Sequence, residues 1–152
     1  MQLVSDSDHV QLSRLVIEAA WRVDAGHADT LHELFADEGE LILPATWSNG
    51  KLIVPETSLR GREAIHEWGQ RLVEEKTFRC IRHVCGNMRF VADGPDAAEG
   101  KTILTVYVAA GSAPATTLPF QVGEDHDRFV RTERGWRLAS RRWLELFGRQ
   151  EI

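Results

Sequence analysis

Residues 8–38 read DHVQLSRLVIEAAWRVDAGHADTLHELFADE, and this stretch decides the fold. Its first part, residues 8–24, places apolar side chains at steps of three and four, which is the spacing of an amphipathic helix with one buried face. These side chains are Leu12, Leu15, Val16, Ala19, Ala20 and Val23. Gly26 then favours the end of the helix, because glycine adopts the backbone conformation that closes many helices.

A second, short helix is expected directly after this stop. Thr30 and Glu33 have the spacing of a capping box, in which both side chains bond free N–H groups at a helix start. The apolar pattern continues through Phe35. A third helix is expected after Gly61, where helical spacing returns. Its apolar residues are Ile65, Trp68, Leu72 and Val73.

The second half of the chain has the texture of β-strands. Four extended segments are separated by turn-rich stretches, and they lie at about residues 78–92, 100–110, 118–132 and 136–147. Strands joined in this way favour an antiparallel meander. Residues 40–45 are also strand-like, and a turn signal at 47–51 precedes a short hairpin or an irregular lid. Helices followed by a sheet predict a single α+β domain over residues 1–152.

The composition is that of an ordinary globular chain. The sequence has 152 residues, 43% of them hydrophobic, and a net charge of −5, which is too apolar for a disordered protein. The acidic excess opposes binding to a phosphate backbone, so nucleic acid is not an expected partner. No apolar run approaches the length of a membrane span, and the N-terminus lacks the pattern of a secretory signal. We expect no membrane association and a cytoplasmic location.

Neither the cysteines nor the histidines predict a metal site. Cys80 and Cys85 lie five residues apart on one extended segment, so they point to opposite faces and are expected to be reduced thiols. Asp125, His126 and Asp127 cannot chelate as a unit, because adjacent strand residues alternate faces.

Asp24 is an unusual residue for its position. It continues the apolar face of the first helix, four residues after Ala20, and it lies at the C-terminal end, where the helix dipole disfavours an anion. Two interpretations remain open. Either the carboxylate bonds the following turn and stays partly exposed, or it is buried beside a cation or a hydrogen-bond donor.

His83 lies in the middle of the segment FRCIRHVCGNMRF, residues 78–90. Strict alternation separates this segment into two faces, with Val84, Met88 and Phe90 on one and Ile81, His83, Cys85 and Asn87 on the other. The second face mixes apolar and small polar groups, which suits the wall of a pocket. His83 is therefore either a hydrogen-bonded structural residue or a general base, since imidazole titrates near neutral pH.

Four parts of the sequence resemble SnoaL-like proteins of the nuclear transport factor 2-like superfamily. They read DAGHADTLHELFADE (24–38), LRGREAI (59–65), RHVCGN (82–87), and DRFVR (127–131) leading into GWRLA (135–139). Their order is that of the family, and the resemblance covers about residues 8–147.

The resemblance implies a cone-shaped α+β barrel, in which a strongly bent, mainly antiparallel sheet wraps around the N-terminal helices and leaves a deep apolar cavity. Relatives such as scytalone dehydratase, bile-acid 7α-dehydratase and hexachlorocyclohexane dehydrochlorinase use a His–Asp pair in that cavity. Asp24 matches the helix aspartate of the family, and His83 matches its strand histidine. The implied activity is proton abstraction from carbon in a dehydration, isomerisation, elimination or cyclisation. No metal or cofactor is expected to take part.

The resemblance leaves the proton donor of such a reaction unassigned. Relatives often have a tyrosine five residues before the helix aspartate, where this chain has Ala19, and an aromatic residue where it has Asp125. Tyr107, the only tyrosine, is a candidate donor or a packing residue of the cavity wall.

Other side chains are candidates for substrate binding. Aromatic residues in the wall would suit a flat, ring-bearing ligand, although they also suit a simple core; they are Trp21, Phe35, Trp47, Trp68 and Phe120. Most late arginines are expected on the solvated face of the sheet. Arg128, Arg141 or Arg142 would bind an anionic substrate if the strand register turns it inward, and Arg128 is the candidate.

A second class of function stays open. The same fold serves as a non-catalytic ligand-binding or dimeric scaffold module, and the small subunit of ring-hydroxylating dioxygenases resembles it too. A hydrogen bond between Asp24 and His83 inside an enclosed pocket would favour the enzyme, and separated side chains would favour the module. We expect a homodimer or higher homo-oligomer that acts on a small molecule, because a meander that covers helices with one face leaves its other face to be covered.

Overall fold

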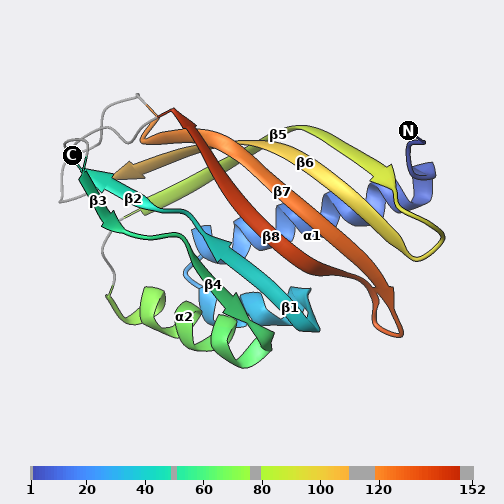
Figure 1. The fold of residues 1–152 in the computed structure, drawn as a ribbon, viewed down its shortest axis with the longest axis horizontal. Coiled ribbons are helices and arrows are strands. Elements are labelled where there is room, and N and C mark those ends of the chain that lie inside the picture. The colour runs from blue at the N-terminus through green and yellow to red at the C-terminus, as the bar shows by residue number, and fades with distance from the viewer. Residues whose placement is uncertain (1, 49–50, 76–79, 110–118, 148–152) are drawn as a thin grey trace.

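The computed structural model describes residues 2–48, 51–75, 80–109 and 119–147, the side chains of 46–48 excepted. The helices are α1 (Asp6–Asp24), the 3-10 helix η1 (Ala28–Leu34) and α2 (Gly61–Glu75). The strands are β1 (Phe35–Leu43), β2 (Thr46–Ser48), β3 (Lys51–Val54), β4 (Thr57–Arg60), β5 (Cys80–Ala92), β6 (Ala97–Ala109), β7 (Gln121–Thr132) and β8 (Gly135–Phe147). Figure 1 shows the long strands as one bent sheet, with α1 behind it and α2 below β1 and β4.

Six strands form the main sheet in the order β4-β1-β8-β7-β6-β5. Strands β5 to β8 are the predicted antiparallel meander, and β1 joins β8 in parallel. The sheet is strongly curved around α1 but does not close, since β4 and β5 are its two edges. The cone-shaped α+β fold implied by the resemblance is confirmed. Strands β2 and β3 pair by themselves as the hairpin expected near residues 47–51.

The core lies between α1 and the concave face of the sheet. The helix buries the predicted apolar face, and Leu12 and Val16 are fully inaccessible to solvent. Each such side chain contributes roughly 1.5–3 kcal/mol through burial. Phe90 and Phe129 meet edge to face at 5.7 Å between ring centroids. Gly100 makes this pair possible, because a Cβ there would lie 2.8 Å from atoms of both rings.

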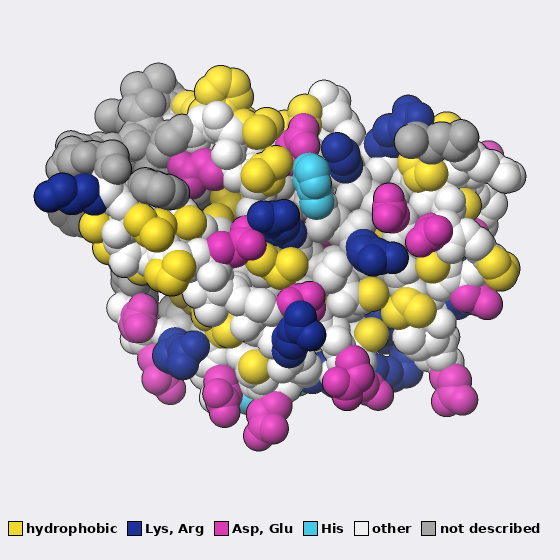
Figure 2. Space-filling view, viewed as in Figure 1, with side chains coloured by type: hydrophobic (Ala, Val, Ile, Leu, Met, Phe, Trp, Pro, Cys, Tyr) yellow, Lys and Arg dark blue, Asp and Glu magenta, His cyan; other side chains and the backbone are white. Residues whose placement is uncertain are grey.

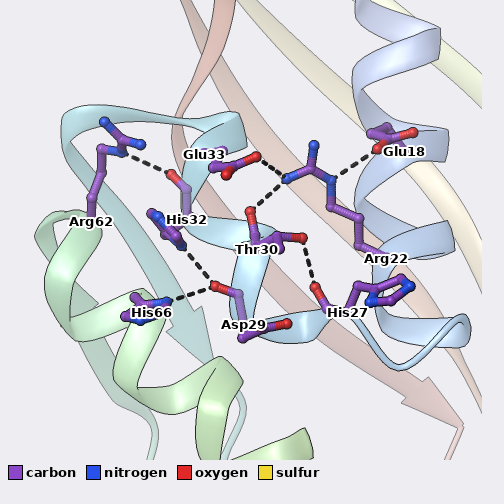
Figure 3. Close-up of polar contacts among 9 residues, drawn as sticks. All are labelled: Glu18, Arg22, His27, Asp29, Thr30, His32, Glu33, Arg62 and His66. Atoms are coloured by element: carbon purple, nitrogen blue, oxygen red, sulfur yellow. Dashed lines mark hydrogen bonds and ion pairs between the residues drawn. The ribbon is translucent and has the colours of Figure 1, made fainter.

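The corner after α1 differs from the predicted capping box. The Thr30 hydroxyl donates to the main-chain oxygen of His27 at 2.7 Å and does not cap a helix, while Glu33 accepts from Arg22 at 2.8 Å (Figure 3). Arg22 also donates to Glu18 and to the main-chain oxygen of Thr30. An arginine with three acceptors thus replaces the capping box. The second helix is accordingly a 3-10 helix that ends at Leu34, one residue before the predicted end.

Helix α2 is fixed against the same corner. His32 and His66 both direct Nδ1 at the main-chain oxygen of Asp29, at 2.8 and 2.7 Å (Figure 3). A carbonyl oxygen only accepts, so each Nδ1 carries the proton in this arrangement. Gly69 lies directly against the backbone of Ala28, where any Cβ would collide. This corner therefore sets where α1 ends and, with it, the position of Asp24. Among the described residues, no helix has an apolar stretch long enough to span a membrane.

Candidate active site

Asp24 and His83 form a hydrogen-bonded pair at the concave face of the sheet. Nδ1 of His83 lies 2.6 Å from Oδ1 of Asp24, and the backbone N–H of His83 donates to Oδ2 at 2.9 Å. The side chains are only 14% and 15% exposed. An ionised carboxylate only accepts hydrogen bonds, so Nδ1 carries a proton and Nε2 keeps a lone pair in the neutral ring. The side chain of Asp24 thus reaches a donor on β5 rather than the turn that follows α1.

The end of α1 brings this carboxylate to β5. Asp24 is the last residue of the helix, and its main-chain oxygen accepts from Nη1 of Arg82 at 3.1 Å. Carbonyl groups at a helix C-terminus lack partners within the helix, and a basic side chain is a usual substitute. Arg82 and His83 therefore hold Asp24 from two sides, one through its backbone and the other through its carboxylate.

A β-bulge in β5 changes the face of half the strand. The register with β6 shifts between Gly86 and Arg89, and Asn87 has a φ of 47°. Strict alternation placed His83 and Phe90 on opposite faces, and this prediction was wrong because a bulge inserts one extra residue. His83 and Phe90 both point inward, whereas Val84 is 55% exposed.

His83 lines a cavity of about 500 Å³ between α1, α2 and the sheet. Most of the lining side chains are apolar. They include Ala19, Val23, Leu31, Leu41, Leu59, Trp68, Ile81, Leu104, Val106, Phe120 and Trp143. The polar lining includes Gln121, Asp125 and Arg141 on β7 and β8. Such a cavity suits a small, mainly apolar ligand with a few polar groups.

A buried charged cluster stands beside this cavity. Arg141 donates from Nε and Nη2 to Asp127 at 2.8 and 2.7 Å, and its Nη1 lies 3.5 Å from Asp125. All three residues are buried. The pairing follows from the register, because Arg141 lies directly opposite Asp127 on the neighbouring strand.

Burial has different consequences for Asp125 and Arg141. Desolvation raises the pKa of Asp125 to about 6, and Arg141 opposes this shift only in part. Burial also acts to lower the pKa of Arg141, but Asp125 and Asp127 outweigh it and raise that pKa above its ordinary value. Arg141 is therefore permanently charged, whereas the pKa of Asp125 lies close to neutral pH.

Cys85 lies on the same face of β5 as His83 and is half-buried. Desolvation raises the pKa of its thiol to about 11, and Asp125 and Asp24 add to the effect. Cys80 and Cys85 are both free thiols.

The structure brings together only some of the residues singled out from the sequence. Trp68 and Phe120 line the cavity, together with His83. Phe35 is fully buried in the core instead, and Trp21 and Tyr107 are 56% and 37% exposed and do not line the cavity. The side chain of Trp47 lies outside the described residues.

The inward arginine is Arg141. Arg128, the sequence candidate, points outward and lies 3.6 Å from Asp93 with a side chain that is 65% exposed. Arg142 is also exposed and pairs with Glu56. The sequence analysis missed Asp125 as a cavity residue and considered it only as a lost aromatic position and as part of a rejected metal site. Alternation from Phe129, a core residue, puts Asp127 and Asp125 on the inner face and would have found both.

No group of three or more His, Cys, Asp or Glu side chains suited to a metal ion occurs within the described ranges.

The sequence matches a known family over most of its length. Residues 6–142 match the family model of the SnoaL-like domain. Among curated protein sequences, none matches the chain.

Solved structures share the fold. Aln2 from a Streptomyces species is 21% identical, with a TM-score of 0.75 over 95% of this chain and 94% of Aln2. A provisionally assigned scytalone dehydratase from Novosphingobium aromaticivorans is 14% identical, with a TM-score of 0.70 over 98% of this chain and 93% of its own. A single-residue variant of a protein of unknown function from Mycobacterium tuberculosis is 20% identical, with a TM-score of 0.71 over 93% of this chain and 77% of its own. At these identities the likeness concerns the fold alone.

Proposed function

Because this chain belongs to the SnoaL-like family, we propose that it is a cofactor-independent lyase or isomerase of the dehydratase type. Its His83–Asp24 pair would remove a carbon-bound proton from a small, apolar, cyclic or polyketide-like substrate. The observation that carries the proposal is the 2.6 Å hydrogen bond between the two side chains, formed by a histidine that lines a cavity of about 500 Å³. The fold shared with a provisionally assigned scytalone dehydratase supports the same reaction class.

In this proposal, each member of the pair has a separate task. Nε2 of His83 accepts the proton, because Nδ1 is already engaged with Asp24. Asp24 holds the tautomer and stabilises the imidazolium that forms. The backbone N–H of His83 fixes the second carboxylate oxygen at 2.9 Å, so the carboxylate has little freedom to turn away.

The lining of the cavity supports the proposed substrate class. Its walls combine aliphatic side chains with the rings of Trp68, Phe120 and Trp143. Aromatic walls favour a flat ring system. The proton removed must be acidified by a neighbouring carbonyl group, since an imidazole is too weak a base for an unactivated C–H bond. Bicyclic ketones combine these properties.

Hydrogen exchange tests the base without a requirement for the natural substrate. 1-Tetralone, a bicyclic ketone with acidic protons beside its carbonyl group, would be incubated with the protein in deuterated water and followed by mass spectrometry. We expect exchange above the buffer rate, and a loss of roughly 100-fold or more in His83→Gln. The control is His126→Gln, because His126 lies on β7, does not line the cavity and contacts Glu124 at 2.7 Å.

Two outcomes would contradict the proposal. His83→Gln with unchanged exchange would remove His83 from the chemistry. A wild-type protein that binds 1-tetralone without any exchange would favour the ligand-binding module instead.

The outer face of the sheet supports a homodimer. Exposed apolar side chains gather there from three strands, namely Val84 on β5, Ile103 and Tyr107 on β6, and Leu144 and Leu146 on β8. Figure 2, viewed from the side of the sheet opposite α1, shows hydrophobic side chains among charged ones. A second copy of the chain would cover this mixed face.

Sedimentation equilibrium tests the assembly. We expect twice the mass of one chain for the wild type and a monomer for Leu144→Glu. The control is Val10→Glu, an exposed apolar position on α1, which should leave the dimer intact. A monomeric wild type would rule the homodimer out.

A further inference from the structure

We propose that Asp125 is the general acid of this site, and that its protonated carboxyl group donates a proton to the oxygen of the departing group. The inference rests on the proposed function and names the proton donor that the sequence left unassigned. Arg141 lines the same cavity and lies 3.5 Å from Asp125.

The balance of charge in the buried cluster is the first argument. Two carboxylates, Asp125 and Asp127, share the single guanidinium of Arg141. Asp127 takes both short hydrogen bonds of that guanidinium, whereas Asp125 has only the contact at 3.5 Å. Burying an unpaired charge is costly, and a carboxyl group avoids the cost by keeping its proton. Asp125 is therefore the carboxyl group that favours the neutral, proton-bearing form.

The surroundings of Asp125 support this protonation state. The groups that act electrostatically on it are Arg141 on β8, Asp127 and His126 on β7, and His83 on β5. Arg141, and the two histidines when they are protonated, favour the ionised form of Asp125. Desolvation and Asp127 favour its protonated form. Desolvation is the largest effect, and it raises the pKa of Asp125 to about 6. An acid with a pKa near the working pH both holds a proton and releases it readily.

The position of Asp125 is the second argument. Among the described residues that line the cavity, Asp125 is the one carboxyl group, and Asp127 does not line it. Tyr107, the donor suggested by the sequence, points away from the cavity because Val106 beside it points in. His83 enters the same cavity from β5, two strands away from β7. A ligand in the cavity is thus exposed to a base on one strand and an acid on another.

The elimination of water needs only two protein groups, His83 and Asp125. The C–H proton passes to Nε2 of His83, and its electron pair forms the new C=C bond. The C–O bond to the departing hydroxyl breaks, its electron pair stays on the oxygen, and the Asp125 proton completes a water molecule. The enzyme is then left with a protonated His83 and an ionised Asp125. Transfer of one proton from His83 to Asp125 through solvent restores the starting state.

Three probe compounds distinguish the contribution of the acid from that of the base. 1-Tetralone exchanges deuterium and needs only the base. 3-Hydroxy-1-tetralone loses water to give fluorescent 1-naphthol and needs both groups. 3-Acetoxy-1-tetralone gives the same product but expels acetate, which leaves as an anion without a proton. The proteins compared are the wild type, His83→Gln, Asp125→Asn and the control Glu124→Gln, whose side chain contacts His126 and does not line the cavity.

We expect Asp125→Asn to dehydrate 3-hydroxy-1-tetralone roughly 100-fold or more slowly than the wild type. The same variant should keep at least half of the rate of acetate elimination and of deuterium exchange. His83→Gln should lose all three reactions, and Glu124→Gln should lose none. In the wild type, dehydration should fall as the pH rises above about 6, whereas acetate elimination should not.

Three other results would contradict the acid role of Asp125 or the proposed function. Normal dehydration by Asp125→Asn would refute the acid role while His83 and the proposed function stand. Equal losses on the hydroxy and acetoxy probes would show a structural role for Asp125 and refute proton donation. A wild type without exchange or elimination on any probe would refute the proposed function, and the acid role with it.

Discussion

Arg141 donates two short hydrogen bonds to Asp127 but lies 3.5 Å from Asp125, two residues earlier on the same strand. One guanidinium therefore compensates one carboxylate fully and the other only weakly. This asymmetry separates two aspartates that look equivalent in the sequence. Asp127 is placed to hold Arg141 in the core, and Asp125 is placed to change its charge at the edge of the cavity.

The first prediction concerns stability and pH in Asp125→Asn. Burial raises the pKa of Asp125 from 3.8 to about 6, so the folded protein binds this proton more tightly than the unfolded chain does. The stabilisation is complete below pH 3.8 and is lost as the pH rises through about 6. An uncharged asparagine avoids this loss, so Asp125→Asn should be the more stable protein near pH 7.5, by up to about 3 kcal/mol.

Urea unfolding near pH 4.5 and near pH 7.5 would measure this difference. The advantage of Asp125→Asn should shrink towards the lower pH, where the wild-type carboxyl group is protonated in the folded state. Glu124→Gln, on the same strand, should show no such change. A variant that is equally destabilised at both pH values would show that Asp125 is buried in its charged form.

The second prediction concerns Arg141→Met. Removal of the guanidinium leaves two buried carboxylates without their cation, which typically costs about 3–5 kcal/mol of stability. The matched control is Arg142→Met, because Arg142 is the next residue, is exposed and pairs with Glu56 at 2.8 Å. Surface pairs contribute roughly 0–1 kcal/mol. Denaturant unfolding near neutral pH should therefore separate the two neighbours, and similar losses would contradict the buried geometry.

The third prediction concerns Asp24→Asn. Both carboxylate oxygens accept from His83, one from Nδ1 and one from the backbone N–H. An asparagine offers one acceptor and one donor, so one of these contacts becomes donor against donor or the imidazole changes tautomer. We expect deuterium exchange into 1-tetralone to fall by roughly 100-fold or more.

The tautomer itself can be observed by nitrogen NMR of the His83 ring. Asp29→Asn is the control, because in the part of the chain that the structure describes it is the main-chain oxygen of Asp29 that holds His32 and His66. Unchanged exchange in Asp24→Asn, with the wild-type tautomer retained, would remove Asp24 from the chemistry.

Short-range patterns predicted the elements of the fold. The apolar spacing of α1 and the four strands of the meander are set by residues within one element, so the sequence contains the whole signal. Asp24 and His83 were predicted in the same way, as polar residues at positions where an apolar or solvated residue was expected. The family resemblance then paired them, although 59 positions separate the two residues.

Features that depend on register were not predictable in this way. One bulge at Asn87 reverses the face of Met88 and Phe90, and strict alternation makes no allowance for it. Arg128 and Arg141 are both arginines on strands, and only the pairing of β7 with β8 decides that Arg141 meets Asp127. A one-residue change of register exchanges the two faces of a strand. The inward direction of Asp125 does not depend on register, because it follows from alternation with Phe129; only the contacts with Arg141 do.

The last prediction uses Cys85 as a reporter between the base and the acid. Desolvation is the largest of the effects that together raise the pKa of its thiol from 9.0 to about 11; Arg141 opposes the shift, and the charges of Asp125 and Asp24 contribute to it. The thiolate is the reactive form, so the native thiol should react with a disulfide reagent near pH 8.5 roughly 100-fold more slowly than the unfolded chain. The measurement requires Cys80→Ser, which leaves Cys85 as the only thiol.

Because the charge of Asp125 raises the pKa of Cys85, adding Asp125→Asn should speed the native reaction, whereas adding Glu124→Gln should not. Equal rates in the folded and unfolded states would show that Cys85 is exposed to solvent. This result would contradict the inward direction of the face of β5 that carries both Cys85 and His83.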